Sequence, residues 1–168
     1  KDPIYQTWSS LKRTTQEILF DTVGEVVARQ TEELRERAKK FRKRPGSLQL
    51  NTSLTIPYYI SSIDIHCMPG GYTTELMADD VSAGALFDRG VFLYGRGGLG
   101  KRNDDIGQSF CYWLKKKYPT FRPASILDMG CGIGSNTLPY AHSFPESKVF
   151  AIDLSASLLR YGSARANY

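Results

Sequence analysis

Apolar residues recur at steps of three and four between positions 14 and 43, which predicts a long amphipathic helix. The recurring residues are Leu19, Val23, Val26, Val27, Leu34, Ala38 and Phe41. Thr14 and Glu17 have the spacing of a capping box, in which a hydroxyl and a carboxylate each bond an unpaired amide at the helix start. Pro45-Gly46 is expected to end the helix, so residues 1–50 are interpreted as a helical N-terminal arm.

The helical periodicity is lost between residues 46 and 100, where Gly, Ser, Tyr and Pro are frequent. Leu54–Ile56 and Ile60–Ile65 alternate in part between apolar and polar residues, which predicts short extended segments. A loop-rich stretch of this length is unusual in a compact domain unless it binds a ligand or covers a site. Residues 51–100 are therefore expected to form a cap or lid.

Helical and strand-like patterns alternate from residue 101 onward. The predicted elements are a helix over residues 103–118, strands at 125–128 and 148–153, and helices near 136–144 and from Ser155. Asn103 is expected to cap the first of these helices, on which Ile106, Phe110, Trp113 and Leu114 share one apolar face. The order strand–helix–strand–helix predicts a parallel sheet with right-handed crossovers.

The composition is that of an ordinary soluble globular protein. No stretch approaches the roughly 18 consecutive apolar residues of a membrane helix, so no membrane partner is expected. The three cysteines are odd in number and no two have a metal-type spacing, so neither a disulfide framework nor a metal site is predicted. This cysteine usage favours an intracellular, cytoplasmic protein.

The net charge of +5 is concentrated in the N-terminal arm. Residues 1–50 contain 11 Lys and Arg against 7 Asp and Glu, and the cations gather between Arg35 and Arg44. These cations could form a nucleic-acid surface, or they could be ordinary favourable charges at a helix C-terminus. Because Glu32, Glu33 and Glu36 are interleaved with them, the second interpretation is preferred.

The most informative segment is a strand that runs directly into three glycines at alternate positions, Gly130, Gly132 and Gly134. Glycine allows the backbone to turn sharply and lets a ligand approach without a β-carbon in the way. The following helix would point its N-terminus toward that ligand. In open α/β sheets, such a crevice at the carboxyl ends of the strands is where ligands bind.

Three features make this turn more informative than a glycine-rich turn alone. The glycine spacing is Gly-x-Gly-x-Gly, and the third glycine of the dinucleotide pattern is replaced by Ser135. Asp128 ends the first strand, where a negative charge suits an ammonium group and disfavours a pyrophosphate. Asp153 ends the second strand and could accept both ribose hydroxyls of a nucleoside. That last feature alone does not separate an adenosyl ligand from NAD, so an NAD(P)-dependent oxidoreductase stays an alternative.

Residues Leu127–Gly134 closely resemble the first motif of class I S-adenosylmethionine-dependent methyltransferases, and Ala151–Ser155 resemble their second. The resemblance implies that the loop from Gly130 to Gly134, Cys131 included, wraps the methionine part of the cofactor. It also implies that Asp128 lies near the amino group, that Asp153 binds the ribose hydroxyls and that Leu154 packs on the adenine.

The resemblance also defines the expected fold class, a Rossmann-like α/β doubly wound sheet preceded by a helical N-terminal extension. The clear match covers residues 103–168. Further strands follow the second motif in this family, whereas only 15 residues follow Asp153 here. Residues 101–168 are therefore expected to hold the first β-α-β-α of the S-adenosylmethionine-binding core, which would expose strand edges and would not act alone.

Two further residues are weaker candidates. The segment Phe87–Gly95 loosely resembles the aromatic lead-in that covers the cofactor in some small-molecule methyltransferases, and Tyr94 is its candidate contact. His66 could be a general base, or a metal ligand with Cys67, but a structural or pocket-lining role is preferred. No catalytic residue is assigned.

The function predicted from these observations is S-adenosylmethionine-dependent methyl transfer to a nucleophile, a small molecule being favoured over a nucleic acid. Two alternatives remain beside it. One is a methyltransferase-like binding or scaffold module without activity, and the other is the NAD(P)-dependent oxidoreductase.

Overall fold

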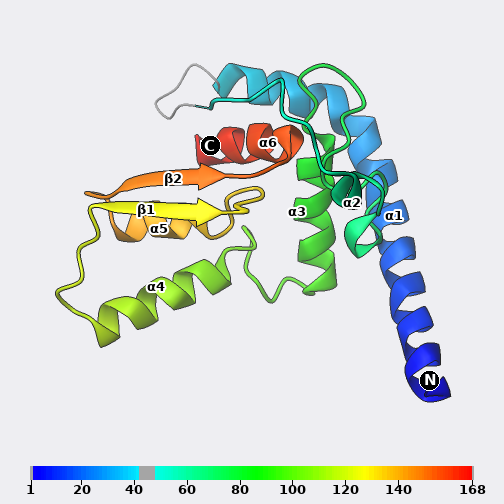
Figure 1. Ribbon diagram of the computed structural model, residues 1–168, viewed down its shortest axis with the longest axis horizontal. Coiled ribbons are helices and arrows are strands. Elements are labelled where there is room, and N and C mark those ends of the chain that lie inside the picture. Colours follow the sequence, from blue (N-terminus) through cyan, green and yellow to red (C-terminus); the bar gives the residue numbers. More distant parts are fainter. Residues whose placement is uncertain (1, 42–47, 168) are drawn as a thin grey trace.

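The computed structural model describes residues 2–41 and 48–167 and shows a mixed α/β protein (Figure 1). The elements are α1 (Pro3–Phe41), α2 (Tyr58–Ser61), the 3-10 helix η1 (Ile65–Cys67), α3 (Ser82–Tyr94), α4 (Asp105–Lys117), β1 (Ser125–Met129), α5 (Thr137–Ser143), β2 (Lys148–Ile152) and α6 (Ala156–Ala166). Across these two ranges, no helix combines the length and apolar character needed to cross a bilayer.

The two strands form a parallel pair in which Ser125 lies opposite Lys148 and Met129 opposite Ile152. Helix α5 is the crossover between them, which confirms the predicted order strand–helix–strand–helix. Both arrows point toward the side of the molecule where α3 and α1 lie (Figure 1). The arrangement is compatible with part of a Rossmann-like methyltransferase fold, and it places the carboxyl ends of both strands at one edge.

Among the described residues, one face of this sheet is uncovered. Leu127, Met129, Phe150 and Ile152 alternate along the two strands and pair in register, so their side chains share a face. Each of them is between 46% and 73% exposed.

The main hydrophobic core lies between three helices that pack together, α1, α3 and α6. Its buried members are Phe20, Val23, Val27, Met68, Ala83, Ala85, Leu86, Ile133 and Leu158. Two glycines of α3 permit this packing. A methyl group on Gly84 would lie 2.4 Å from Cβ of Tyr161, and one on Gly90 would lie 2.3 Å from the ring of Phe20. Helix α3 therefore approaches its neighbours more closely than any larger residue would allow.

Helix α1 begins earlier than the sequence pattern predicted. The Asp2 carboxylate accepts the Ile4 amide at 2.9 Å, and Pro3 occupies the first turn, where its missing N–H costs nothing. The predicted capping box is wrong, because Thr14 and Glu17 lie in the interior of α1, where Glu17 pairs with Arg13. The predicted stop at residues 45–46 lies outside the described residues.

The prediction that residues 46–100 lack regular structure is also wrong, because they contain the 13-residue helix α3. Its glycines lower the local helix propensity, but packing against α1 and α6 compensates for that loss. The extended segments expected at 54–56 and 60–65 are not strands. Pro57 instead precedes the short helix α2, and η1 follows it.

Helix α4 has the predicted extent but buries a different face. Gly107 and Cys111 are its buried residues, and a methyl group on Gly107 would lie 2.9 Å from the ring of Pro139 in α5. Phe110 and Trp113 stack on each other and are nearly half exposed. Asn103 does not cap this helix, because its amide donates to the carbonyl and the carboxylate of Asp88 at 2.8 Å each.

Candidate functional site

The glycine turn after β1 has a backbone that only glycine adopts readily. Gly130, Gly132 and Gly134 have φ values of +74°, +54° and +79°. Added β-carbons would meet nothing within 4 Å at Gly130 and only ordinary contacts at 3.8 Å at the other two. Conformation rather than crowding therefore requires these glycines, and the space above Gly130 is open to a ligand.

Asp153 ties this turn to the loop that follows β2. One of its carboxylate oxygens accepts the Gly132 amide at 2.9 Å, and the other accepts the Ser155 amide at 2.8 Å. A carboxylate offers about four acceptor positions, so about two remain for a ligand. Because the Asp153 side chain is only half-buried, those positions can be reached.

Asp128 places a second carboxylate beside the turn. It is half-buried at the end of β1 and accepts the Thr137 hydroxyl at 2.5 Å, at the first residue of α5. Within the described ranges, neither Asp128 nor Asp153 forms an ion pair. The turn is therefore flanked by two negative charges without a protein counterion, which favours a ligand that carries a positive charge and hydroxyl donors.

Cys131 lies inside the turn as a neutral thiol. Burial raises its pKa to about 12, and the nearby charges of Asp153 and Asp128 act in the same direction. The three cysteines of the chain are all free thiols. Because the thiolate is the reactive form, Cys131 is suited to lining the turn rather than to nucleophilic attack.

Two other residues position the turn, and sequence reasoning missed both. Ile133 is 1% exposed and anchors the turn in the core. Gly162 of α6 allows this contact, because a methyl group there would lie 3.0 Å from the carbonyl of Ile133. Ile133 could have been noticed as an apolar residue between two glycines. Its contact with Gly162 could not, because Gly162 lies far from the turn in sequence.

The structure brings together most of the predicted site residues. Asp128, Gly130, Cys131, Gly132, Gly134 and Asp153 gather at the carboxyl end of the sheet. Leu154 follows Asp153 directly and is 41% exposed, so its side chain is available for contact. Tyr94 ends α3, is largely exposed and has no hydrogen bond or ring contact with the turn among the described residues. Its role stays a prediction.

The segment that precedes α3 lies directly beside this site. The hydroxyl of Ser155, which caps α6, donates to the Tyr72 carbonyl and accepts the Leu158 amide. The Tyr72 hydroxyl is in turn bonded to Nδ1 of His66. Sequence reasoning had singled out His66 but gave no signal that Tyr72 joins it to the loop after β2.

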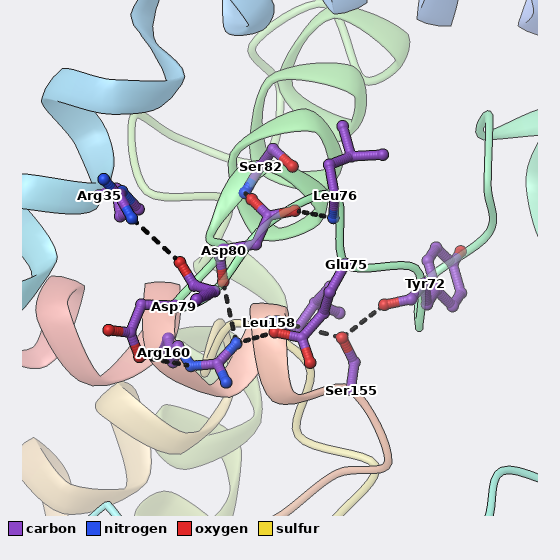
Figure 2. Close-up of polar contacts among 11 residues, drawn as sticks. Arg35, Tyr72, Glu75, Leu76, Asp79, Asp80, Ser82, Ser155, Leu158 and Arg160 are labelled. Atoms are coloured by element: carbon purple, nitrogen blue, oxygen red, sulfur yellow. Dashed lines mark hydrogen bonds and ion pairs between the residues drawn. The ribbon is translucent and has the colours of Figure 1, made fainter.

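Figure 2 shows how this segment is fixed to α6 and α1. The Arg160 guanidinium of α6 pairs with Glu75 and Asp79 and donates to the Asp80 carbonyl, and Arg35 of α1 donates to the Ala78 carbonyl. The side chain of Asp80 is buried and accepts the amides of Leu76 and Ser82. Burial alone would raise the pKa of Asp80, but these amides outweigh burial and hold it below its ordinary value.

Comparisons with known proteins agree with this geometry. Residues 126–168 match the family described as "Methyltransferase domain", which confirms the resemblance to a class I methyltransferase domain over that range. The uncharacterized protein RP028 of Rickettsia prowazekii (strain Madrid E) is 41% identical over 44 residues. That alignment covers 26% of this chain and 18% of the relative. No solved structure matches the chain.

Proposed function

We propose that the glycine turn binds S-adenosylmethionine and that the protein transfers the methyl group to a small-molecule nucleophile. The observation that carries the proposal is the pairing of an open, positive-φ glycine turn with two carboxylates that have no ion pair among the described residues. The methyltransferase-domain match over residues 126–168 supports it.

The residues at the turn fit the chemistry of this cofactor. S-adenosylmethionine, when bound, supplies an electrophilic methyl group on a sulfonium, together with an ammonium and two ribose hydroxyls. Asp153 retains acceptor positions for the hydroxyls, and Asp128 offers a negative charge for the ammonium. The half-exposed side chain of Leu154 would cover the adenine. Rate enhancement in such a site comes largely from positioning and exclusion of water.

The start of α5 disfavours a dinucleotide. In a dinucleotide site the pyrophosphate lies at the N-terminus of the helix that follows the glycine turn. Here that position already holds a carboxylate, because Asp128 accepts the hydroxyl of Thr137. A pyrophosphate would add charge of the same sign.

A small-molecule acceptor is favoured over a nucleic acid because acidic residues offset the cations of α1. The pairs along the helix are Arg35 with Glu32, Arg37 with Glu33, and Lys39 with Glu36. The last three cations of the basic segment, residues 42–44, lie outside the described ranges. The segment around Tyr72, fixed beside Ser155, would form one wall over the acceptor.

The test is a calorimetric titration of the chain with S-adenosylhomocysteine, with NAD as the control ligand. Asp153→Ala is expected to raise the dissociation constant roughly tenfold or more, because a hydrogen bond to a charged group contributes about 1.5–3 kcal/mol. Since Asp153 also holds Gly132, Leu154→Ala provides a variant that removes no hydrogen bond. Asp21→Ala, at an exposed carboxylate of α1, is the matched control and should bind normally.

Tighter binding of NAD than of S-adenosylhomocysteine would overturn the proposal. Binding that neither variant weakens, or no binding by the folded wild-type chain, would do the same. Since residues 101–168 are not expected to act alone, transfer itself is measured with the full-length protein, methyl-labelled S-adenosylmethionine and a fractionated cell extract. Label is expected in the small-molecule fraction, and Asp153→Ala should abolish it.

A further inference from the structure

A groove of about 810 Å³ lies between α1, α3 and α6, behind the glycine turn. We call it the helix groove. Its apolar lining includes Val23, Val26 and Val27 of α1 and Phe92 and Leu93 of α3. Val26 and Leu93 are about half exposed although they stand beside the buried core. The volume is within the range of about 300–1,000 Å³ that is typical of small-molecule sites.

The charged residues of the helix groove are all of one sign. Arg37, Arg89, Lys101, Arg102 and Arg165 line it, and no Asp or Glu of the described residues does. Arg37 is partly offset by Glu33 at 3.9 Å. The other four cations have no ion pair within residues 2–41 and 48–167.

The carboxylate nearest in sequence to this rim is already engaged. Asp88 accepts the Tyr161 hydroxyl at 2.9 Å and the Asn103 amide at 2.8 Å. Burial of the Tyr161 hydroxyl and, to a smaller extent, the negative charge of Asp88 raise the pKa of Tyr161, so that hydroxyl stays a neutral donor to Asp88. Four cations without an ion pair therefore line the groove. The neighbouring Asp88 carboxylate does not neutralise them, because it already accepts two hydrogen bonds.

From an apolar floor and a cationic rim we infer that the helix groove binds a monomeric amphiphile with a phosphate head group and an aliphatic chain. The chain would lie along Val26, Leu93 and Phe92, where it removes apolar surface from water. The head group would lie among Arg89, Lys101 and Arg102, because guanidinium groups bind phosphate oxygens in a bidentate geometry. A purely apolar ligand would leave the cations unused, and a purely anionic ligand would leave the apolar floor exposed to water. A ligand with both parts uses both.

The groove also touches the back of the glycine turn. The Arg165 guanidinium donates to the Ile133 carbonyl and the Ser135 hydroxyl, at 3.4 Å and 3.3 Å, and to the Arg102 carbonyl. Ile133 and Ser135 flank Gly134 in the turn. A phosphate that draws Arg165 toward the groove would compete with these bonds, so Arg165 is the residue that the groove and the turn share.

The test is a calorimetric titration of the chain with dodecyl phosphate below its critical micelle concentration. Dodecanoate, dodecyltrimethylammonium and inorganic phosphate serve as comparison ligands. Dodecyl phosphate is expected to bind most tightly, because four cations favour a doubly charged head group. Inorganic phosphate lacks the chain and dodecyltrimethylammonium lacks the anion, so both should bind at least tenfold more weakly, a loss of about 1.4 kcal/mol or more.

Two pairs of variants locate the site. Val26→Asp places a charge on the groove floor, and Ile18→Asp makes the same change on an exposed part of α1 outside the groove. Arg89→Ala with Lys101→Ala removes two rim cations, and Arg29→Ala with Lys116→Ala removes two exposed cations elsewhere. The first member of each pair should weaken binding roughly tenfold or more, while its control leaves binding unchanged.

The circular dichroism spectrum of each variant verifies that it is folded. Failure of dodecyl phosphate to bind the wild-type chain would overturn the proposal. Equal binding of dodecyltrimethylammonium, or undiminished binding by a folded Val26→Asp variant, would also overturn it. Tighter binding of dodecanoate than of dodecyl phosphate would show that the groove does not select a phosphate head group, and would overturn that part of the proposal. None of these readouts depends on S-adenosylmethionine, so failure here is distinguishable from failure of the proposed methyl transfer.

Discussion

The glycine turn and the helix groove lie on either side of Arg165 and present opposite chemistry. The turn offers main-chain groups flanked by two carboxylates, whereas the groove offers apolar side chains rimmed by cations. The turn depends on three positive φ angles and a small set of hydrogen bonds. The groove depends on how far apart α1, α3 and α6 stand. Backbone changes should therefore affect the turn, and changes in helix spacing should affect the groove.

The largest loss of stability is expected from a substitution that changes this helix spacing. Gly84→Ala would place a β-carbon 2.4 Å from Cβ of Tyr161, so α3 and α6 would have to separate. We expect a loss of about 3 kcal/mol in the free energy of unfolding, at the upper end of the cost of overpacking. The measurement is urea denaturation, and a folded variant should also lose dodecyl phosphate binding.

Gly24→Ala is the matched control for this prediction. Gly24 lies in α1 with nothing within 4 Å of an added β-carbon, so the change should stabilise the helix by up to about 1 kcal/mol. If the two alanine variants had the same stability, close packing of α3 on α6 would not be what requires Gly84.

The next effect concerns the segment before α3 that Arg160 and Arg35 hold in place. Asp80→Ala leaves the part-buried amides of Leu76 and Ser82 without their acceptor, and we expect it to cost about 2 kcal/mol of unfolding free energy. Asp80→Asn should cost less, because its side-chain oxygen can still accept one amide. Equal stability of the Ala and Asn variants would contradict the role assigned to these bonds.

The same carboxylate makes a prediction for pH. The folded pKa of Asp80 is lowered, so its stabilising contribution is complete above the unfolded value of about 3.9 and is lost as pH falls through the folded value. Below about pH 3.9, unfolding free energy should therefore fall less steeply in Asp80→Asn than in the wild type. An unchanged slope would show that the carboxylate does not contribute.

The two regions also differ in how much of them the sequence predicts. The turn was predictable because its requirements are local. Positive φ angles need glycine at each position, and the strand before it is a short apolar run. Asp128 and Asp153 could be placed at one edge because parallel strands align their carboxyl ends. Their hydrogen bonds to Thr137 and Gly132 bear out that placement.

Helix α3 and the groove were not predictable because their requirements are distant in sequence. Gly84 and Gly90 lower helix propensity locally, and their advantage appears only when Tyr161 and Phe20 are packed against them. The cations of the groove come from separate elements, so no run of charge marks them. Likewise Asn103 has the residue type of a helix cap, yet its amide bonds the distant Asp88.

A smaller effect sharpens the contrast from the side of the turn. Gly132→Ala keeps the amide that Asp153 accepts but forces alanine to a φ of +54°, which costs roughly 1–2 kcal/mol. We expect weaker S-adenosylhomocysteine binding and unchanged dodecyl phosphate binding by calorimetry. Loss of binding for both ligands would mean that the turn and the groove form one cooperative unit rather than two sites joined by Arg165.

The smallest expected effect is on the reactivity of Cys131. Because burial and the charges of Asp153 and Asp128 raise its pKa to about 12, the thiol stays protonated at pH 8 and should react with iodoacetamide far more slowly than in urea. Asp128→Asn removes one of these charges and should speed the reaction modestly, while Asp64→Asn, at an exposed carboxylate outside the turn, should not. S-adenosylhomocysteine should slow it further by covering the turn. Equal protection by dodecyl phosphate would place that ligand at the turn and erase the distinction between the two regions.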